Sequence, residues 1–242
     1  ARQLHFYRLA NDLRSDLDLP ALPPHRDKDD PETEENVAAA VAQHLPLDLH
    51  DVSAQFASTQ SGMIGEGLGN GSVMMALPLK GLLGRLGTKV MDDGGAQVPR
   101  LGRELAGAAK LAGVKGIFHA DELPAYGITA DEVRAVRTAL NLADNDAFVL
   151  CCAPSWQARL ALEAVLDRAR LAWHRIPQEV RNVVVKKGAP EDGTTSPMRP
   201  LPGRSRMYPE TDIPPLVLEA EEWANVMETL PMSDEHRTSR LA

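Results

Sequence analysis

The chain has 242 residues, of which 43% are apolar and only 4% aromatic, and its formal net charge is −8. This composition predicts a globular core of aliphatic side chains and gives no sign of a base-stacking platform like that of RNA recognition motifs. No apolar stretch approaches the roughly 20 residues of a membrane span, and Cys151 and Cys152 lie in an apolar run that predicts small buried side chains. We therefore expect a cytoplasmic protein without membrane contact.

The net charge hides an uneven distribution along the chain. Residues 27–51 contain eight acidic side chains against one basic, whereas residues 159–206 contain ten basic against five acidic. Either run fits a solvated surface, but the second also leaves room for a face that contacts the phosphates of RNA.

The first 50 residues suggest a helix, a linker and a second helix. Apolar residues recur at helical spacing over 2–17, which predicts a helix that ends before Pro20. The stretch 19–35 is rich in prolines and charges and poor in apolar residues, so we expect a linker there. A short alanine-rich helix should follow over 36–44.

Residues 52–79 change to short apolar runs separated by glycines, which is typical of strands over 52–56 and 73–77. The glycine-rich residues 62–71 resemble a phosphate-binding loop only superficially, because they lead into a strand and no Gly-Lys-Ser/Thr follows. We therefore expect a turn that joins two antiparallel strands.

An Asp-Asp-Gly-Gly sequence at 92–95 is a hairpin signal, so the segments on its two sides should pair or lie adjacent. Apolar residues at helical spacing then predict a helix over 101–112, with Gly113 as its C-terminal cap. A short strand is expected over 114–118.

A capping box formed by Thr129 and Glu132 predicts a helix that begins there and continues to about Leu142. The apolar run 147–152 predicts a buried strand.

Ser155 is expected to cap a long helix that ends at Leu171. The apolar face of this helix would consist of Leu162, Val165, Leu166 and Ala169. Together these elements predict an α+β domain over 52–185, with a largely antiparallel sheet and helices on one of its faces. The chain beyond residue 187, with four prolines between 190 and 202, is expected to be irregular up to a helix over 216–227.

One segment, Gly116-Ile-Phe-His-Ala-Asp-Glu-Leu-Pro-Ala-Tyr-Gly-Ile-Thr129, concentrates side chains with chemical potential. His119, Asp121 and Glu122 could ligate a metal, but tight sites need three or four suitably spaced donors and no further one is near. The two acids fit better as caps of a turn or partners of a basic surface, which leaves Phe118 and Tyr126 to pack.

A second segment, Met198-Arg-Pro-Leu-Pro-Gly-Arg-Ser-Arg-Met-Tyr-Pro-Glu-Thr-Asp-Ile-Pro-Pro215, combines prolines with an arginine cluster. Arg199, Arg204 and Arg206 would offer bidentate donors to phosphate groups of RNA from an irregular surface loop. Alternatively, they pair with acids of the same chain.

Tyr208 precedes two acids, Glu210 and Asp212, which could form a catalytic carboxylate pair. The prolines on both sides favour a rigid extended segment, in which these acids accept hydrogen bonds from backbone or arginine donors.

These two segments are similar to parts of the E subunit (GatE) of the archaeal glutamyl-tRNA(Gln) amidotransferase. The first resembles a segment of the GAD insertion domain that GatE shares with bacterial aspartyl-tRNA synthetases, and the second resembles the return from that insertion to the body. The resemblance implies a helix and linker of the body over 1–50, the insertion domain over 52–185, and the return segment with the start of a helical region over 190–242. The acidic linker at 27–35 matches no element of the family.

The resemblance also implies a function. The family converts Glu-tRNA(Gln) to Gln-tRNA(Gln) in translation, using ATP and Mg, with tRNA(Gln) as substrate and the glutaminase-type D subunit as partner. We expect this segment to contribute tRNA contact or domain positioning, and to be inactive alone, with no catalytic residue, cofactor or metal of its own.

Two alternatives stay open at this point. The first is the insertion domain of an aspartyl-tRNA synthetase. A synthetase core would bring a Gly-rich motif that ends in Glu-Arg and an Arg-x-Glu motif, but neither occurs, and residues 208–212 are foreign to such enzymes. The second is a structural spacer that does not touch RNA.

Overall fold

The computed structural model describes residues 2–91, 93, 97–176, 179–183, 195–200 and 223–225. The chain divides into two units, residues 1–201 and 202–242, and in the second the structure describes only 223–225, which are helical. The helices of the first unit are α1 (Arg2–Asp16), α2 (Pro31–His44), α3 (Gly62–Gly69), α4 (Leu101–Leu111), α5 (Ala130–Ala139) and α6 (Ser155–Arg170). Among the described residues, no helix has the length and apolar character that crossing a membrane requires.

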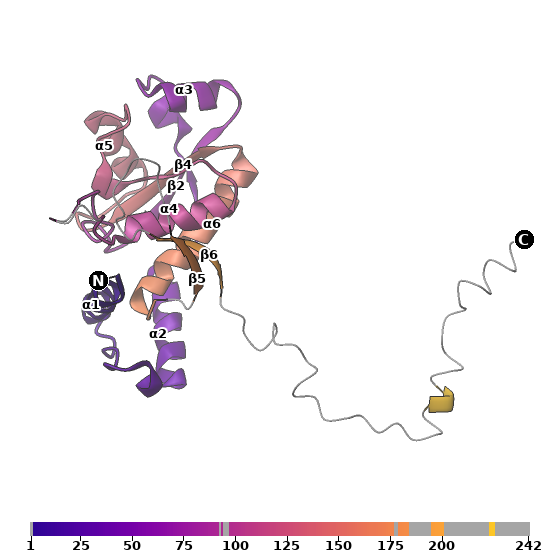
Figure 1. Ribbon diagram of the computed structural model, residues 1–242. Helices are drawn as coiled ribbons and strands as arrows, with labels where there is room; N and C mark the ends of the chain where they lie inside the picture. The colour runs from indigo at the N-terminus through magenta and orange to yellow at the C-terminus, as the bar shows by residue number, and fades with distance from the viewer. Residues whose placement is uncertain are drawn as a thin grey trace, which may run out of the picture. The chain divides into compact units, whose positions relative to one another are not determined.

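A four-stranded antiparallel sheet, ordered β1-β2-β4-β3, lies at the centre of the first unit (Figure 1). Its strands are β1 (His50–Asp51), β2 (Val73–Leu79), β3 (Phe118–His119) and β4 (Ala147–Ala153). β2 and β4 pair along their whole length, with Met75 opposite Cys151. The predicted α+β class with an antiparallel sheet is confirmed, as are the strands expected over 73–77 and 147–152.

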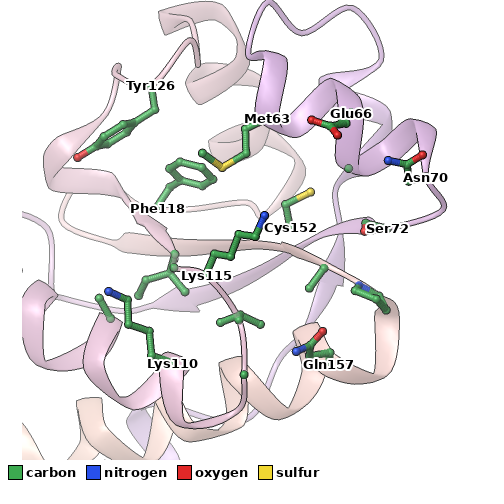
Figure 2. Close-up of a pocket in the computed structure, with 18 residues that line it drawn as sticks. Met63, Glu66, Asn70, Ser72, Lys110, Lys115, Phe118, Tyr126, Cys152 and Gln157 are labelled. Carbon is green, nitrogen blue, oxygen red and sulfur yellow. The ribbon is translucent and has the colours of Figure 1, made fainter.

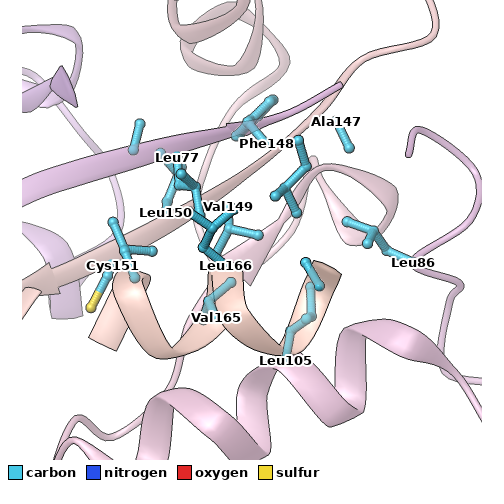
Figure 3. Packing of buried hydrophobic residues seen from close by; sticks show 14 of the residues in the cluster. Leu77, Leu86, Leu105, Ala147, Phe148, Val149, Leu150, Cys151, Val165 and Leu166 are labelled. Carbon is cyan, nitrogen blue, oxygen red and sulfur yellow. The ribbon is translucent and has the colours of Figure 1, made fainter. Parts of the chain in front are cut away.

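Helix α6 packs on one face of this sheet, and α4 packs against α6. Val165 and Leu166 of α6 lie beneath Val149 of β4 in the core (Figure 3). The apolar face predicted for α6 is confirmed, because all four of its residues are buried. Burying one such aliphatic side chain contributes about 1.5–3 kcal/mol, so this face is a main source of stability.

Shorter segments cover the opposite face of the sheet. Cys151 points toward α6 (Figure 3), so Cys152 points the other way, toward α3. A Cβ on Gly67 of α3 would lie 2.7 Å from the Cys152 Sγ atom, so this approach needs glycine. Both cysteines are free thiols, and burial raises the pKa of Cys151 to about 12, as expected of a small core residue.

The segment between β1 and β2 differs from the prediction. Residues 53–56, expected to be a strand, form a 3-10 helix, and the glycine-rich residues form α3 instead of a turn. Phe56 and Ile64 are both fully buried. Their packing against the sheet outweighs the low helix propensity of the glycines.

The first 45 residues pack into the same core as the sheet, through residues such as Phe6, Leu13 and Val41. Helix α1 ends within one residue of its predicted limit, but α2 begins at Pro31, well before the expected start, with Asp30 as its N-cap. The expected linker over 19–35 was therefore too long. Where the domain boundary lies in the whole protein stays a prediction.

Arginine side chains order the short linker that remains. Arg14 is fully buried and donates to the carbonyls of Trp173 (2.6 Å) and Pro20 (2.9 Å) and to the Glu34 carboxylate (2.6 and 2.7 Å). The His174 Nδ1 atom lies 2.7 Å from the same carboxylate. We call Arg14, Glu34 and His174 the Arg14 cluster. These hydrogen bonds thus add to the burial of Leu22 in ordering this stretch.

Several local signals were correct. Gly113 follows the end of α4 with φ +86°, and the capping box of Thr129 and Glu132 is present at the start of α5. The segments around 92–95 pair through a bridge between Met91 and Gln97.

Other boundaries were wrong. Ser155 is the first residue of α6, and Pro154 occupies the N-cap position without a side-chain hydrogen bond. The strand expected over 114–118 is shorter and begins later, because only Phe118 and His119 form β3. Residues 195–200, expected to be irregular, form strand β6 (Thr195–Pro200), which pairs with β5 (Glu179–Val183), because pairing satisfies backbone groups whatever the propensity of the side chains.

Candidate functional site

The loop over 116–129 is fastened on one side through Asp121. Its carboxylate accepts hydrogen bonds from the backbone N–H groups of Gly84 and Gly87, both at 2.8 Å. Both glycines have positive φ, so they belong to a tight turn that an acid can cap. Asp121 therefore fixes the loop to the segment that precedes α4.

On its other side the loop makes a left-handed turn. Tyr126 and Gly127 have φ values of +60° and +82°, and the Ser61 hydroxyl donates to the Tyr126 carbonyl at 2.8 Å. A Cβ on Gly127 would lie 2.8 Å from the Ser61 Cα atom, so both the conformation and the close approach need glycine. The Tyr126 side chain remains 59% exposed.

Glu122 connects the loop to the start of α4. It forms an ion pair with Arg100, lies 3.3 Å from the His119 Nε2 atom, and accepts a hydrogen bond from the Tyr126 hydroxyl at 3.4 Å. Burial and the Glu122 carboxylate raise the pKa of Tyr126, so its phenol stays protonated and acts as the donor. His119 and Tyr126 of the segment thus gather around one acid, which is paired with Arg100.

His119 is buried beneath the loop. Burial lowers the pKa of its imidazole more than Glu122 and Asp121 raise it, so the ring is neutral at neutral pH. A Cβ on Gly102 of α4 would lie 2.4 Å from the His119 Nε2 atom, which shows how tightly the helix packs on the ring. Among the described residues there is no group of three or more His, Cys, Asp or Glu side chains that could hold a metal.

A groove runs along α4 from the Lys89 segment, past this loop, to α3 and the start of α6. It comprises two adjoining hollows of about 710 and 520 Å³ that share Ala106, Lys110, Ile117 and Tyr126. We call it the α4 groove. The small residues Ala106 and Gly107 line it, so a ligand can approach the helix backbone closely.

The α4 groove is basic although the chain is acidic. Its bases are Lys89, Arg100, Arg103, Lys110, Lys115 and Arg181, and its acids are Glu66, Glu104 and Glu122. Glu104 and Glu122 are already paired with arginines. Lys89, Lys110 and Lys115 are exposed, and no acid of the described residues pairs with them. These lysines leave a positive field that is available to an anionic ligand.

Glu104 supports the groove from inside. This buried acid lies 3.0 Å from Arg2 and 3.4 Å from both Arg168 and Arg181. Burial alone would raise the pKa of Glu104, but the hydrogen bond from Arg2 and the charges of the three arginines hold it below its usual value. The acid therefore stays ionised and joins α1, α4, α6 and β5.

The structure brings together some of the residues singled out in the sequence. His119, Glu122 and Tyr126 line the α4 groove, whereas Asp121 faces the turn at 84–87. Arg199 lies in strand β6, with its backbone opposite Val180. The remaining residues, Arg204, Arg206, Tyr208, Glu210 and Asp212, are outside the described residues.

Sequence reasoning missed the three unpaired lysines. Lys110 follows Arg103 by seven positions on α4, a spacing that places both on one helix face. That signal was present in the sequence. Lys89 and Lys115 lie in irregular segments, and nothing local indicates that they face the same groove.

Comparison with known proteins relates this chain to two kinds of sequence. Residues 64–162 match the GAD domain. Proteins named as the E subunit of glutamyl-tRNA(Gln) amidotransferase are similar over a longer stretch: that of Methanopyrus kandleri is 44% identical over 197 residues, or 81% of this chain and 29% of the relative. Those of Methanosarcina acetivorans and Thermococcus sibiricus are 44% and 40% identical over 74% and 82% of this chain. The chain spans less than a third of the length of these relatives.

Proposed function

We propose that this chain, which carries a GAD domain and is related to part of GatE from archaeal glutamyl-tRNA(Gln) amidotransferase, acts within such an enzyme. The enzyme would convert Glu-tRNA(Gln) to Gln-tRNA(Gln) in the cytoplasm, with ATP and Mg as cofactors and the glutaminase-type D subunit as partner. The similarity to GatE covers about twice the length of the GAD domain. It therefore favours this parent over an aspartyl-tRNA synthetase, for which only the shared domain would match.

Within that enzyme we assign this segment to contact with tRNA. The observation that supports this role is the α4 groove, where Lys89, Lys110 and Lys115 have no acidic partner among the described residues. Cations that neutralise phosphates release condensed counterions, and this release drives most sequence-independent binding to nucleic acids. A spacer without RNA contact would have no need for three uncompensated positive charges in one groove.

A binding measurement tests this role. We expect fluorescence anisotropy with labelled tRNA(Gln) to show salt-dependent binding, and Lys110→Ala with Lys115→Ala to lower the slope of log affinity against log salt by about 1.8, at about 0.9 per phosphate contact. The control variant, Lys28→Ala with Lys80→Ala, removes two exposed lysines outside the groove. Equal slopes for both double variants would contradict the assignment.

The arginines of the second segment belong to the same proposal. Thr195 of β6 and Arg181 of β5 both line the α4 groove, so the backbone of Arg199 lies near it. Changing Arg199, Arg204 and Arg206 together to alanine should lower the salt slope with tRNA(Gln) if they contact phosphates. If they pair with Glu210 and Asp212 instead, the same variant should melt at a lower temperature with an unchanged slope.

A further inference from the structure

The larger hollow of the α4 groove contains the exposed side chains of Tyr126 and Met63 beside the half-buried Phe118, and the positive charge of the groove does not explain them. Phe118 and Tyr126 contact each other with ring centroids 5.6 Å apart, and Met63 lines the same pocket with 63% of its surface exposed. Figure 2 draws these three side chains together. Exposed apolar groups that gather in a concave site are typical of ligand binding, whereas single exposed ones need no explanation.

The same hollow also has cations and neutral hydrogen-bonding groups. Lys110 and Lys115 line it without acidic partners among the described residues, and Asn70, Ser72 and Gln157 add amides and a hydroxyl (Figure 2). Glu66 is the one acid among the residues that line this hollow. A ligand that matches these walls has a flat apolar part with polar edges and a negative charge.

The Tyr126 ring is held in place before any ligand arrives. Its backbone adopts the left-handed conformation, its carbonyl accepts from Ser61, and its hydroxyl donates to Glu122. A side chain that is already ordered loses little conformational entropy on binding, so its contacts contribute more fully to affinity. The ring therefore has the properties of a stacking surface.

We propose that this hollow binds one unpaired nucleotide of RNA, with its base stacked on Tyr126 beside Phe118 and its phosphate near Lys110 and Lys115. The volume of about 710 Å³ falls in the range of sites for molecules of nucleotide size. A base inside a duplex is stacked on its neighbours and cannot enter, so the site selects single-stranded positions. This inference rests on the proposed function, because the nucleotide would belong to the tRNA held by the groove.

The experiment uses the 242-residue chain with two fluorescent probes, a short unstructured RNA oligonucleotide and a blunt-ended RNA duplex of the same sequence. We expect Tyr126→Asn to weaken oligonucleotide binding about tenfold, a typical loss for one stacked base, and to leave duplex binding nearly unchanged. Asparagine tolerates the left-handed backbone, so the loop should stay folded. Tyr126→Phe should retain most of the affinity, because it keeps the ring and loses only the hydrogen bond to Glu122.

A matched control is Trp156→Ala, which removes an exposed ring of α6 that does not line the hollow. Melting temperatures of all variants report whether each one is folded. Equal effects of Tyr126→Asn and Trp156→Ala on the oligonucleotide would overturn the nucleotide site.

The remaining outcomes separate this inference from the function on which it rests. If neither probe binds, the proposed RNA contact fails and the nucleotide site fails with it. If the duplex binds in a lysine-dependent way while Tyr126→Asn has no effect on the oligonucleotide, the RNA contact stands and the nucleotide site is wrong. If polyglutamate displaces the oligonucleotide equally well from the parent chain and from Tyr126→Asn, the hollow is a general site for polyanions such as acidic peptides, and the nucleotide site is again wrong.

Discussion

The Arg14 cluster and the α4 groove use the same kinds of charged residues in opposite ways. In the cluster, Arg14 is fully buried and its guanidinium donates to two carbonyls and the Glu34 carboxylate. In the groove, Lys89, Lys110 and Lys115 are exposed and lack acidic partners among the described residues. The comparison teaches that charge supports the fold where it is paired and buried, and is available to a ligand where it is neither.

The largest expected effect is the loss of the Arg14 cluster. Arg14→Leu leaves the Glu34 carboxylate and two carbonyls without their donor, which should lower the free energy of unfolding by about 3–5 kcal/mol. Denaturant unfolding at neutral pH measures this change. Arg14→Lys is the control, and it should recover only part of the stability because an ammonium cannot reproduce the forked geometry. Full stability of Arg14→Leu would mean that the cluster is not structural.

Glu104 combines features of both regions, because it is buried as Arg14 is and also lines the α4 groove. Glu104→Gln should lower the free energy of unfolding by about 2–3 kcal/mol, because Arg168 loses its charged partner and Arg181 loses one of its two. The pKa of Glu104 is lowered in the folded state, so this contribution is present above pH about 4.5 and is lost as the pH falls through the folded pKa.

The control for Glu104 is Glu163→Gln, which breaks an exposed pair with Arg159 and should change stability by less than about 0.5 kcal/mol. If Glu104→Gln and Glu163→Gln lowered the free energy of unfolding by similar amounts, burial would not strengthen the ion pairs of Glu104.

His119 lies beneath the α4 groove but adds no charge to it, because its imidazole is neutral. Its pKa is lowered mainly by burial, so the unfolded chain binds more protons below pH about 6.5, and stability should fall as the pH decreases from there. The slope from this residue cannot exceed about 1.4 kcal/mol per pH unit. Between pH about 7 and about 5, which is above the range where most carboxylates titrate, the free energy of unfolding of His119→Gln should depend less steeply on pH than that of the parent chain.

His25→Gln is the control in that experiment, since His25 is exposed. An identical pH dependence of the parent chain and His119→Gln would refute the neutral buried state of the imidazole.

The smallest expected effect concerns Lys89, at the end of the groove away from the aromatic pair. Lys89→Ala should change the free energy of unfolding by less than about 0.5 kcal/mol, because it breaks no pair with an acid of the described residues. It should lower the salt slope of tRNA binding by about 0.9 if the RNA backbone extends over both hollows. Lys80→Ala is the control. If the salt slope of Lys89→Ala equalled that of Lys80→Ala, RNA would contact only the hollow around Lys110 and Lys115.

The sequence by itself determined the elements that depend on local periodicity and local hydrogen bonds. Helix α6, strand β4, the capping box at Thr129 and the end of α4 at Gly113 were all predicted, because their signals lie within one turn or one strand. It also indicated that the loop over 116–129 is chemically distinctive. The antiparallel α+β class followed from the order of these elements.

Only the tertiary structure decided the rest. The glycine-rich segment became α3 because Ile64 is buried against the sheet, and the linker was ordered by Arg14 through partners as distant in sequence as Trp173. The α4 groove combines residues from Lys89 to Arg181, and no local pattern shows that they meet. Burial and ion pairing are set by contacts between distant segments, so the sequence could identify the basic residues, and only the fold could determine which of them remain unpaired.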